Sequence, residues 1–479
     1  MKVLILGGGR VGVGIANYLH NQEQADVTII EKSEEVAEKI RTDHNISVLV
    51  GDAVNVEVLK EANAEMASHL IATMSSDEQN IIACKFAWSL FNIKTKIARI
   101  RSNSFLQGNI FELFLKENFD IDIIIQPEIA IANEISRIAC VKGAVDVINL
   151  EGVVVVELKC LEDTQAVNTP LRYLSGVTKL NLFILTISRN NETFVPGSND
   201  MLLPGDYAYV AIAQTELSEV LDFFGYHRPE EQHILIIGGG SIGTTVLRFI
   251  LDSNPAIRIT LLEESIERAE YIAQYFPQIT TVLGNATNSS LLMETVHDVD
   301  TAIVVTGKEK NNILSTIFLQ RLKVPRILTL SEIKNYAFLF PMNSNGVLVD
   351  PSIITIETML HQLRHGKIKS VTPMRNQLGD VVEAVVTESC LSVGNEVKSL
   401  RQDGRIVPFF VIRDKQAIPI QKNTSLELDD VVVMLIAKGF LKSVEENFVN
   451  YFYAKDSKIE NSIDDDDELE RLINEDDHE

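Results

Sequence analysis

The chain has 479 residues, of which 46% are hydrophobic, and it carries a formal net charge of −24. A length of this order predicts three or four domains, each large enough to bury a core. The acidic balance argues against a nucleic-acid partner, because nucleic-acid binding needs a basic surface. No apolar run approaches a membrane span and no signal sequence precedes the first apolar segment, so we expect a soluble, cytoplasmic protein.

The first apolar segment, Lys2 to Leu6, runs into the turn Gly7-Gly8-Gly9-Arg10-Val11-Gly12 and then into an amphipathic stretch. This GxGxxG spacing is typical of dinucleotide folds, in which the glycines allow a tight turn, a close approach to phosphate and helix packing. The free N–H groups and dipole of the following helix also favour phosphate. A second strand closes on Glu31, at about the spacing of the acid that holds a ribose. Glycine turns of this kind also occur for packing alone.

Strands and helices alternate over the rest of this region. The predicted elements are a helix over Glu34 to Arg41, a strand over Ser47 to Val50 ending in Gly51-Asp52-Ala53, a helix over Val56 to Ala62, a strand over His69 to Thr73 leading into Met74-Ser75, a helix over Asn80 to Phe91, and strands over Lys96 to Ile100 and Ile121 to Ile125. This alternation predicts an α/β, doubly wound, Rossmann-like parallel sheet. Ligands of such sheets lie beyond the carboxyl ends of the strands, where the glycine turn, Glu31, Asp52, Met74 and Ser75 all fall.

A connecting helix, Ile129 to Val141, follows, and the pattern then becomes rich in strands. These are predicted over Val145 to Leu150, Val153 to Leu158, Leu180 to Ser188 and Tyr207 to Ala213, and they indicate a small α+β lobe.

The whole arrangement then repeats. After a linker, Tyr226 to Gln232, a strand ends in Gly238-Gly239-Gly240-Ser241-Ile242-Gly243, a second one ends at Glu263, and Thr306 takes the place of Met74. Ile356 to His365 is a second connecting helix, before a second strand-rich lobe. The predicted division is an N-lobe over 1–128, a connecting helix and C-lobe over 129–225, a second N-lobe with its linker over 226–351, a second connecting helix and C-lobe over 352–455, and an acidic tail over 456–479. The tail holds twelve acids against two bases, so we expect it to be disordered.

Two further patterns are weak as functional sites. The four cysteines, Cys84, Cys140, Cys160 and Cys390, have no CxxC spacing and are expected to be buried free thiols. His361 and His365 have the spacing of a zinc pair on a helix, but no third ligand is evident, so we expect no metal site.

With the glycine turns, Glu31, the Gly51-Asp52-Ala53 stretch and the Lys96 to Ser102 stretch placed, the chain resembles the TrkA family over about residues 1 to 450. The resemblance implies a cytoplasmic regulatory subunit with two RCK modules, which forms a homo-oligomeric ring on a membrane potassium translocating subunit. It implies that NAD(H) or ATP/ADP binds and changes the shape of the ring. The positions that match the family's nucleotide contacts are Gly7 to Gly12, Glu31, Met74, Ser75, Arg99 and Arg101, and in the second half Gly238 to Gly243, Glu263 and Thr306.

The sequence departs from the family pattern in two places. Met74 stands where the family has a threonine, which leaves only its backbone for a contact. In the second half we place Leu328 and Leu330 at the positions of the two arginines, so we expect weaker phosphate binding there.

The residues leave the ligand and the class of function open. The charge of Glu31 disfavours the 2′-phosphate of NADP but does not separate NAD from ATP. Arg10 suits either a terminal phosphate or a surface acid. An NAD-dependent oxidoreductase and a stand-alone nucleotide sensor are the alternatives to a transport regulator. We expect no enzyme, because neither strand-rich lobe shows a clustered proton donor for hydride transfer.

Overall fold

The computed structural model describes residues 2–101, 117–190, 192–227, 232–332, 346–363, 368–376, 378–387, 405–421, 424–437 and 440. It forms two compact units. One unit contains both parallel sheets and comprises Met1–Val147, Val156–Val167 and Ser218–Leu363. The other comprises the described residues of Ile148–Val155, of Asn168–Leu217 and of the stretch from Arg364 onward. The predicted lobe boundaries follow the order along the chain and stay a prediction, as does the acidic tail, which lies outside the described residues.

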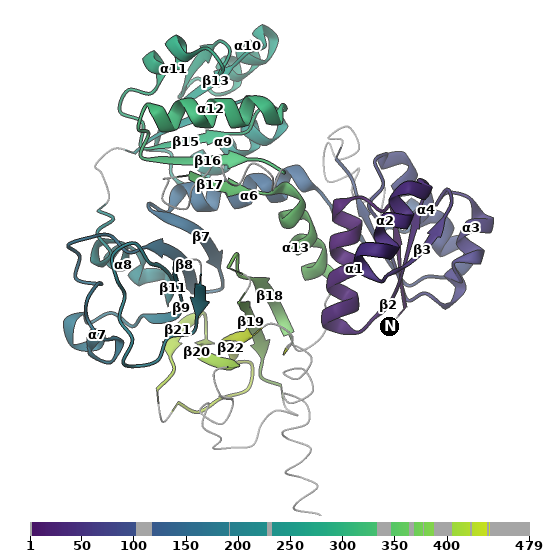
Figure 1. Ribbon diagram of the computed structural model, residues 1–479, viewed down its shortest axis with the longest axis horizontal. Helices are drawn as coiled ribbons and strands as arrows, with labels where there is room; N and C mark the ends of the chain where they lie inside the picture. The colour runs from purple at the N-terminus through teal and green to yellow at the C-terminus, as the bar shows by residue number, and fades with distance from the viewer. Residues whose placement is uncertain are drawn as a thin grey trace, which may run out of the picture. The chain divides into compact units, whose positions relative to one another are not determined.

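The first half begins with a six-stranded parallel sheet in the order β3-β2-β1-β4-β5-β6 (Figure 1). Its strands are β1 (Lys2–Leu6), β2 (Asp26–Glu31), β3 (Ser47–Val50), β4 (His69–Ala72), β5 (Thr95–Arg99) and β6 (Ile123–Ile125). Its helices are α1 (Arg10–Glu23), α2 (Glu34–His44), α3 (Val56–Glu61), the 3-10 turn η1 (Ala64–Met66) and α4 (Asp77–Phe91). The chain winds outward from β1 to β3 and then crosses to β4, so the turn after β1 lies at the point where the strand order reverses. The predicted doubly wound sheet is confirmed.

The second half repeats this sheet in the order β14-β13-β12-β15-β16-β17, again all parallel. Its strands are β12 (His233–Ile237), β13 (Arg258–Glu263), β14 (Thr280–Leu283), β15 (Thr301–Val304), β16 (Arg326–Leu330) and β17 (Gly346–Val349). Its helices are α9 (Ser241–Ser253), α10 (Ile266–Tyr275), α11 (Ser289–Thr295) and α12 (Glu309–Arg321). The duplication expected from the two glycine turns therefore holds strand by strand.

The two parallel sheets exchange their connecting helices. Helix α6 (Pro127–Cys140) leaves the first sheet and packs against α9, while α13 (Pro351–Leu363) leaves the second sheet and packs against α1 (Figure 1). Met359 and Leu360 of α13 are buried in the same core cluster as Val3 and Ile5 of β1. A side chain at Gly14 would meet Ile356 Cδ1 at 2.3 Å. Helix α13 is therefore part of the first half's hydrophobic core and α6 packs on a helix of the second half, which the linear order of lobes does not reveal.

Each strand-rich region forms a five-stranded sheet, with the orders β10-β9-β11-β8-β7 and β18-β19-β22-β20-β21. The elements of the first are β7 (Ala144–Asn149), β8 (Val153–Lys159), α7 (Leu171–Val177), β9 (Phe183–Arg189), β10 (Glu192–Phe194), β11 (Tyr207–Ala213), η3 (Gln214–Glu216) and α8 (Leu217–Phe223). Those of the second are β18 (Ile368–Pro373), β19 (Gly379–Val385), β20 (Ile406–Arg413), β21 (Gln416–Pro419) and β22 (Val431–Ala437). The two sheets share one core, in which the rings of Phe183 and Phe410 lie 5.2 Å apart. The short strand β10 and the helices α7 and α8 were not predicted.

The cysteines give a first testable prediction. Cys84 and Cys160 are buried and Cys140 is half-buried, all as free thiols, whereas Cys390 lies outside the described residues. Burial raises the pKa of the Cys84 thiol to about 12. Since only the thiolate attacks disulfide reagents, Cys84 should stay unmodified by Ellman's reagent at pH 8 and react once urea unfolds the chain. Peptide mapping would identify the modified residue, and rapid labelling of Cys84 in the folded protein would contradict its burial.

Candidate functional site: two glycine turns

Two glycines in each turn are required by the fold itself. Gly7 and Gly238 follow β1 and β12 with φ of +102° and +105°, a backbone conformation that side chains disfavour. A Cβ on Gly12 would lie 2.0 Å from Gly7 O, and one on Gly243 would lie 1.8 Å from Gly238 O. The first glycine therefore makes the turn, and the last lets the helix pack against it.

The middle glycines, Gly9 and Gly240, are different. Gly9 has φ −72° and ψ 177°, and Gly240 has φ −67° and ψ −167°, which any residue adopts. Both are exposed, and a Cβ on either would meet no atom within 4 Å. Neither conformation nor packing requires glycine here. Glycine at these positions leaves the backbone exposed, as the second glycine of a dinucleotide-binding turn does.

The helix after each glycine turn begins without a side-chain cap. Ser33, Asn55 and Ser76 cap α2, α3 and α4 by accepting backbone N–H groups. In contrast, the N-cap residues of α1 and α9 are Gly9 and Gly240, which provide no side-chain cap. No side chain at the cap position accepts their first N–H groups, and the helix dipole adds a positive potential beside an exposed glycine. This geometry suits a phosphate group.

An acid holds each turn in place. Glu31 accepts the Gly8 N–H at Oε2 (2.7 Å) and the Ser33 N–H at Oε1 (2.9 Å). Glu263 accepts the Gly239 N–H at 2.6 Å and the Ser265 N–H at 2.8 Å in the same way. A carboxylate offers about four acceptor positions, so each acid keeps capacity for a ligand hydroxyl. The pairing also explains the spacing of about 24 residues between turn and acid.

Asp52 stands at the end of β3, as predicted, and pairs with a neighbour of Glu31. Its Oδ2 lies 3.0 Å from Lys32 Nζ, and its Oδ1 accepts the Val54 N–H. The hydrogen bond from Lys32 is the largest reason that the pKa of Asp52 is lowered. Both side chains are open to solvent, so this pair is a weak contact that a ligand can rearrange.

The backbone groups of Met74 are engaged within the protein. Its N–H donates to Asn80 Oδ1 at 3.0 Å, and its carbonyl accepts from both Asn80 and Arg99. Asn312 binds the Thr306 N–H (2.8 Å) and hydroxyl (2.6 Å) in the second half. The two asparagines thus brace the loops at the carboxyl ends of β4 and β15. Ser75 is exposed beside the first of these loops.

Arg99 and Arg101 stand at the end of β5, close to the first turn. Arg99 donates to Thr73 O at 3.0 Å and to Met74 O at 3.1 Å, and its buried Nε has no hydrogen-bond partner among the described residues. Burial, followed by the charge of Arg101, lowers the pKa of Arg99 to about 10, so it remains charged at neutral pH. Arg101 is exposed, with its N–H held by Asp77.

The positions predicted to replace these arginines in the second half were wrong. Asn80 Nδ2 binds Arg99 O and Asn312 Nδ2 binds Leu330 O, each at 2.8 Å, so Leu330 is the counterpart of Arg99. Likewise Asp77 binds the Arg101 N–H and Glu309 binds the Glu332 N–H, which makes Glu332 the counterpart of Arg101. A shift of two residues keeps the same face of a strand, so the alternation of side chains could not reveal the error. An acid, not a leucine, stands in place of Arg101.

Arg10 contacts acidic residues, which is one of the two roles that the sequence allowed for it. Its Nη2 lies 2.8 Å from Asp350 Oδ2, and its Nη1 donates to the carbonyl of Glu332. Both partners lie just beyond the carboxyl ends of strands of the second parallel sheet, β16 and β17. The structure therefore brings the first glycine turn against the end of the other sheet, a contact between residues 340 apart in the chain.

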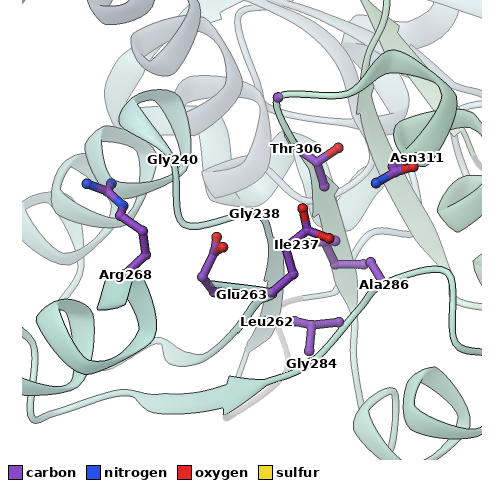
Figure 2. Close-up of a pocket in the computed structure, with 12 residues that line it drawn as sticks. Ile237, Gly238, Gly240, Leu262, Glu263, Arg268, Gly284, Ala286, Thr306 and Asn311 are labelled. Carbon is purple, nitrogen blue, oxygen red and sulfur yellow. The ribbon is translucent and has the colours of Figure 1, made fainter. Parts of the chain in front are cut away.

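The second turn opens into a hollow of about 160 Å³ at the carboxyl edge of its sheet. Figure 2 shows Glu263 and Arg268 on one side of Gly238, with Thr306 and Asn311 on the other. Arg268 was not predicted. It lies in the first turn of α10 and donates to the Gly239 carbonyl through both Nε and Nη2. The sequence signal that could have identified it is its position, five residues after the acid that ends β13 and on the helix that follows.

One of the two histidines with the spacing of a zinc pair lies within the described residues. His361 lies in α13, and His365 falls outside the described residues. Within the described ranges no three His, Cys, Asp or Glu side chains gather as metal ligands. No helix placed by the structure combines the length and hydropathy of a bilayer span.

Known proteins are similar in sequence to nearly the whole chain. The model of the TrkA-N domain family matches twice, over residues 3–127 and 234–345. The Trk system potassium uptake protein TrkA of Azorhizobium caulinodans is 31% identical over 452 residues, which cover 94% of this chain and 98% of that protein. The protein of the same name from Haemophilus influenzae is 26% identical, with the same two coverages.

Solved structures share the fold at lower identity. The RCK domain of GsuK matches with a TM-score of 0.56 at 16% identity, over 94% of this chain and 95% of that chain. The GsuK channel bound to NAD matches with a TM-score of 0.56 at 16% identity, over 95% and 79%. The architecture is thus that of RCK domains: two Rossmann-like parallel sheets, each followed by an antiparallel sheet.

The family match falls on the two glycine-turn sheets, and the similarity to the full-length relatives extends through both strand-rich regions. The chain therefore belongs to the TrkA family of Trk system potassium uptake proteins.

Proposed function

We propose that the chain is a nucleotide-binding regulatory subunit of a Trk-type potassium uptake system. Membership of the TrkA family supports the link to potassium uptake. The observation that supports a ligand at the turns is the pair Gly9 and Gly240, which are glycines without a conformational or packing reason. The proposed contacts in the first half are Gly7 to Gly12, Glu31, Asp52, Met74, Ser75, Arg99 and Arg101, and in the second half Gly238 to Gly243, Glu263 and Thr306.

The proposed ligand is an adenine nucleotide, NAD(H) or ATP/ADP. Glu31 and Glu263 keep free acceptor positions for ribose hydroxyls, and their charge opposes a 2′-phosphate. The first half holds three arginines near its turn, one of which contacts Glu332 and Asp350, whereas Arg268 is the arginine that lines the hollow of the second half. We therefore infer that the two sites are unequal and that the first binds the more highly phosphorylated ligand.

The partner that we propose is a membrane potassium translocating subunit, on whose cytoplasmic face the chain assembles as a homo-oligomeric ring. In this role the nucleotide is an effector, not a substrate of hydride transfer. It changes transport only if it binds one conformation of the ring more tightly than another. The exchange of α6 and α13 suits this role, because a change at one turn is carried into the packing of the other half.

Isothermal titration of the protein with ATP, ADP, NAD+ and NADH tests ligand binding directly. Gly9→Asp should weaken binding to the first half by about 10- to 100-fold, because the carboxylate occupies the phosphate position and repels it. The fold should persist, since the site has room for a side chain and aspartate caps helices well. Gly240→Asp is the matched variant for the second half.

Potassium uptake in cells that lack their own regulatory subunit completes the test. Uptake should depend on the chain and change with Gly9→Asp. Unchanged binding in both aspartate variants would rule out the glycine turns as the site. Turnover of NADH at 340 nm with a broad substrate pool would favour an oxidoreductase instead, and failure to co-purify with a potassium transporter in every nucleotide state would favour a stand-alone sensor.

A further inference from the structure

Arg10 lies where the first glycine turn meets the N-terminus of α1. It is the first residue of α1, directly after Gly9, so its side chain starts at the place where a ligand phosphate would meet the helix. Yet both of its amino groups are already engaged. Nη2 lies 2.8 Å from Asp350 Oδ2, and Nη1 donates to the Glu332 carbonyl while the Glu332 carboxylate lies 3.6 Å away.

Asp350 is a fixed partner and not a passing surface charge. It directly precedes α13, and its Oδ1 accepts the Ser352 N–H at 2.8 Å, which caps that helix. Only 11% of its side chain is exposed, compared with 44% for Arg10. The carboxylate is therefore held in place by its own helix, while the arginine reaches across to it and can swing away.

The second half of the chain shows that the fold does not need this contact. Its turn reaches the same geometry with Ser241 in place of Arg10. Gln126, which directly precedes α6, stands in place of Asp350, which directly precedes α13. Arg101 stands in place of Glu332. The arginine and its two acidic partners thus occur together at the first glycine turn and are all absent at the equivalent positions of the second. A purely structural ion pair would be expected at both turns or at neither.

We propose that Asp350 and Glu332 of the second half take the place of a nucleotide phosphate at Arg10, and that phosphate binding at the first turn displaces them. This inference rests on the proposed nucleotide site. Occupancy of the first turn then breaks a link between α1 and the start of α13, the helix that lies in the first half's own core. The two acids also set selectivity, since only a ligand whose phosphates reach Arg10 has to compete with them.

Competition makes a sharp prediction, because removing the competitor must tighten binding. Asp350→Asn removes the charge but keeps the helix cap, since asparagine caps as well as aspartate. The experiment is isothermal titration of the full chain with ATP, ADP and NAD+, in a Gly240→Asp background that leaves only the first turn available. We expect Asp350→Asn to tighten binding of at least one phosphate ligand by about 3- to 10-fold.

A double-mutant cycle with Arg10→Gln separates competition from a general change of charge. Once Arg10 is gone, Asp350→Asn should have no further effect. Asp120→Asn is the matched control, because it removes an equal charge from a surface pair with Lys85 and should leave binding unchanged.

Each result bears on a different claim. If no nucleotide binds the natural protein, the proposed function fails. If binding is present but lost entirely in the Gly240→Asp background, the ligand sits in the second half and the inference is wrong. Unchanged affinity in Asp350→Asn overturns it, and so does equal tightening with and without Arg10, which would reflect the local field alone.

Discussion

Gly12→Ala and Gly243→Ala are each expected to lower the free energy of unfolding of their half by about 3 kcal/mol or more. The added methyl group would lie 2.0 Å and 1.8 Å from the carbonyl oxygens of Gly7 and Gly238. These oxygens cannot move away, because the same residues are held to the sheet by Gly7 N–Ile30 O and Gly238 N–Leu262 O bonds of 2.9 Å. The better helix propensity of alanine, worth up to about 1 kcal/mol, is too small to offset the clash.

Gly9→Ala and Gly240→Ala provide the matched controls, since they make the same change three residues before Gly12 and Gly243. No atom lies within 4 Å of either added methyl group, and both backbones are already in an ordinary conformation. Alanine there should change the free energy of unfolding by about 0.5 kcal/mol or less, because the restriction of the unfolded chain is offset by the weaker preference of alanine for the helix N-cap.

Urea unfolding combined with hydrogen exchange would measure both effects. In Gly12→Ala, amides of β1 should lose protection while those of β12 keep more of theirs, and Gly243→Ala should show the reverse. Similar midpoints for Gly12→Ala and Gly9→Ala would show that the turn can relax around the methyl group. The claim that the two glycines serve different purposes, one packing and one ligand access, would then fail.

The sequence was sufficient to predict both parallel sheets because several signals agreed along each half. Short apolar strands, helices of the right length and glycine turns recur in the same order, and a strand that is buried on both faces is a continuous apolar run. Glu31 and Glu263 were identified by spacing alone, and the structure shows why the spacing is fixed: each acid accepts an N–H of its own turn.

The contacts between the halves could not be predicted, since nothing local specifies them. Arg10 meets Asp350 across 340 residues, and Met359 completes a core built from the first strands of the chain. Glu332 was missed for a related reason. A strand ending in apolar residues fits its neighbour equally well after a shift of two, and only the hydrogen bonds of Asn312 and Glu309 fix the register. The sequence thus indicated the glycine turn and the acid of each half, but neither Arg268 and Glu332 nor the contacts where the halves meet.

Arg326→Met is the second change with a large expected effect. Arg326 begins β16 of the second sheet, yet its guanidinium reaches the end of α6 from the first half. It donates to Ile138 O and Val141 O at 2.8 Å each and also to Ala144 O. Its charge therefore lies against the negative end of a helix, where a cation is favourable. Burial lowers its pKa to about 10, so it is charged at neutral pH even though it is only 8% exposed.

Methionine keeps much of the side-chain volume but removes the charge and every donor. Two of the three carbonyls, Ile138 O and Val141 O, also accept backbone N–H groups at 3.2 Å, so they do not become fully unsatisfied. Methionine also avoids the free-energy cost of burying a charge, which offsets part of the lost stability. The substitution removes three charge-assisted hydrogen bonds, and this loss is larger than the gains. We expect the free energy of unfolding to fall by about 2 to 4 kcal/mol.

The location of the loss distinguishes this contact from general destabilisation. Arg321→Met, which removes an exposed arginine from the last turn of α12, should cost about 0.5 kcal/mol or less. In Arg326→Met, hydrogen exchange should rise first in the last turn of α6 and in α9, against which α6 packs, while β1 stays protected. Because α6 belongs to one half and covers the other, this pattern would show that Arg326 holds the exchanged helix in place. Equal loss of protection in β1 and α6 would contradict that role.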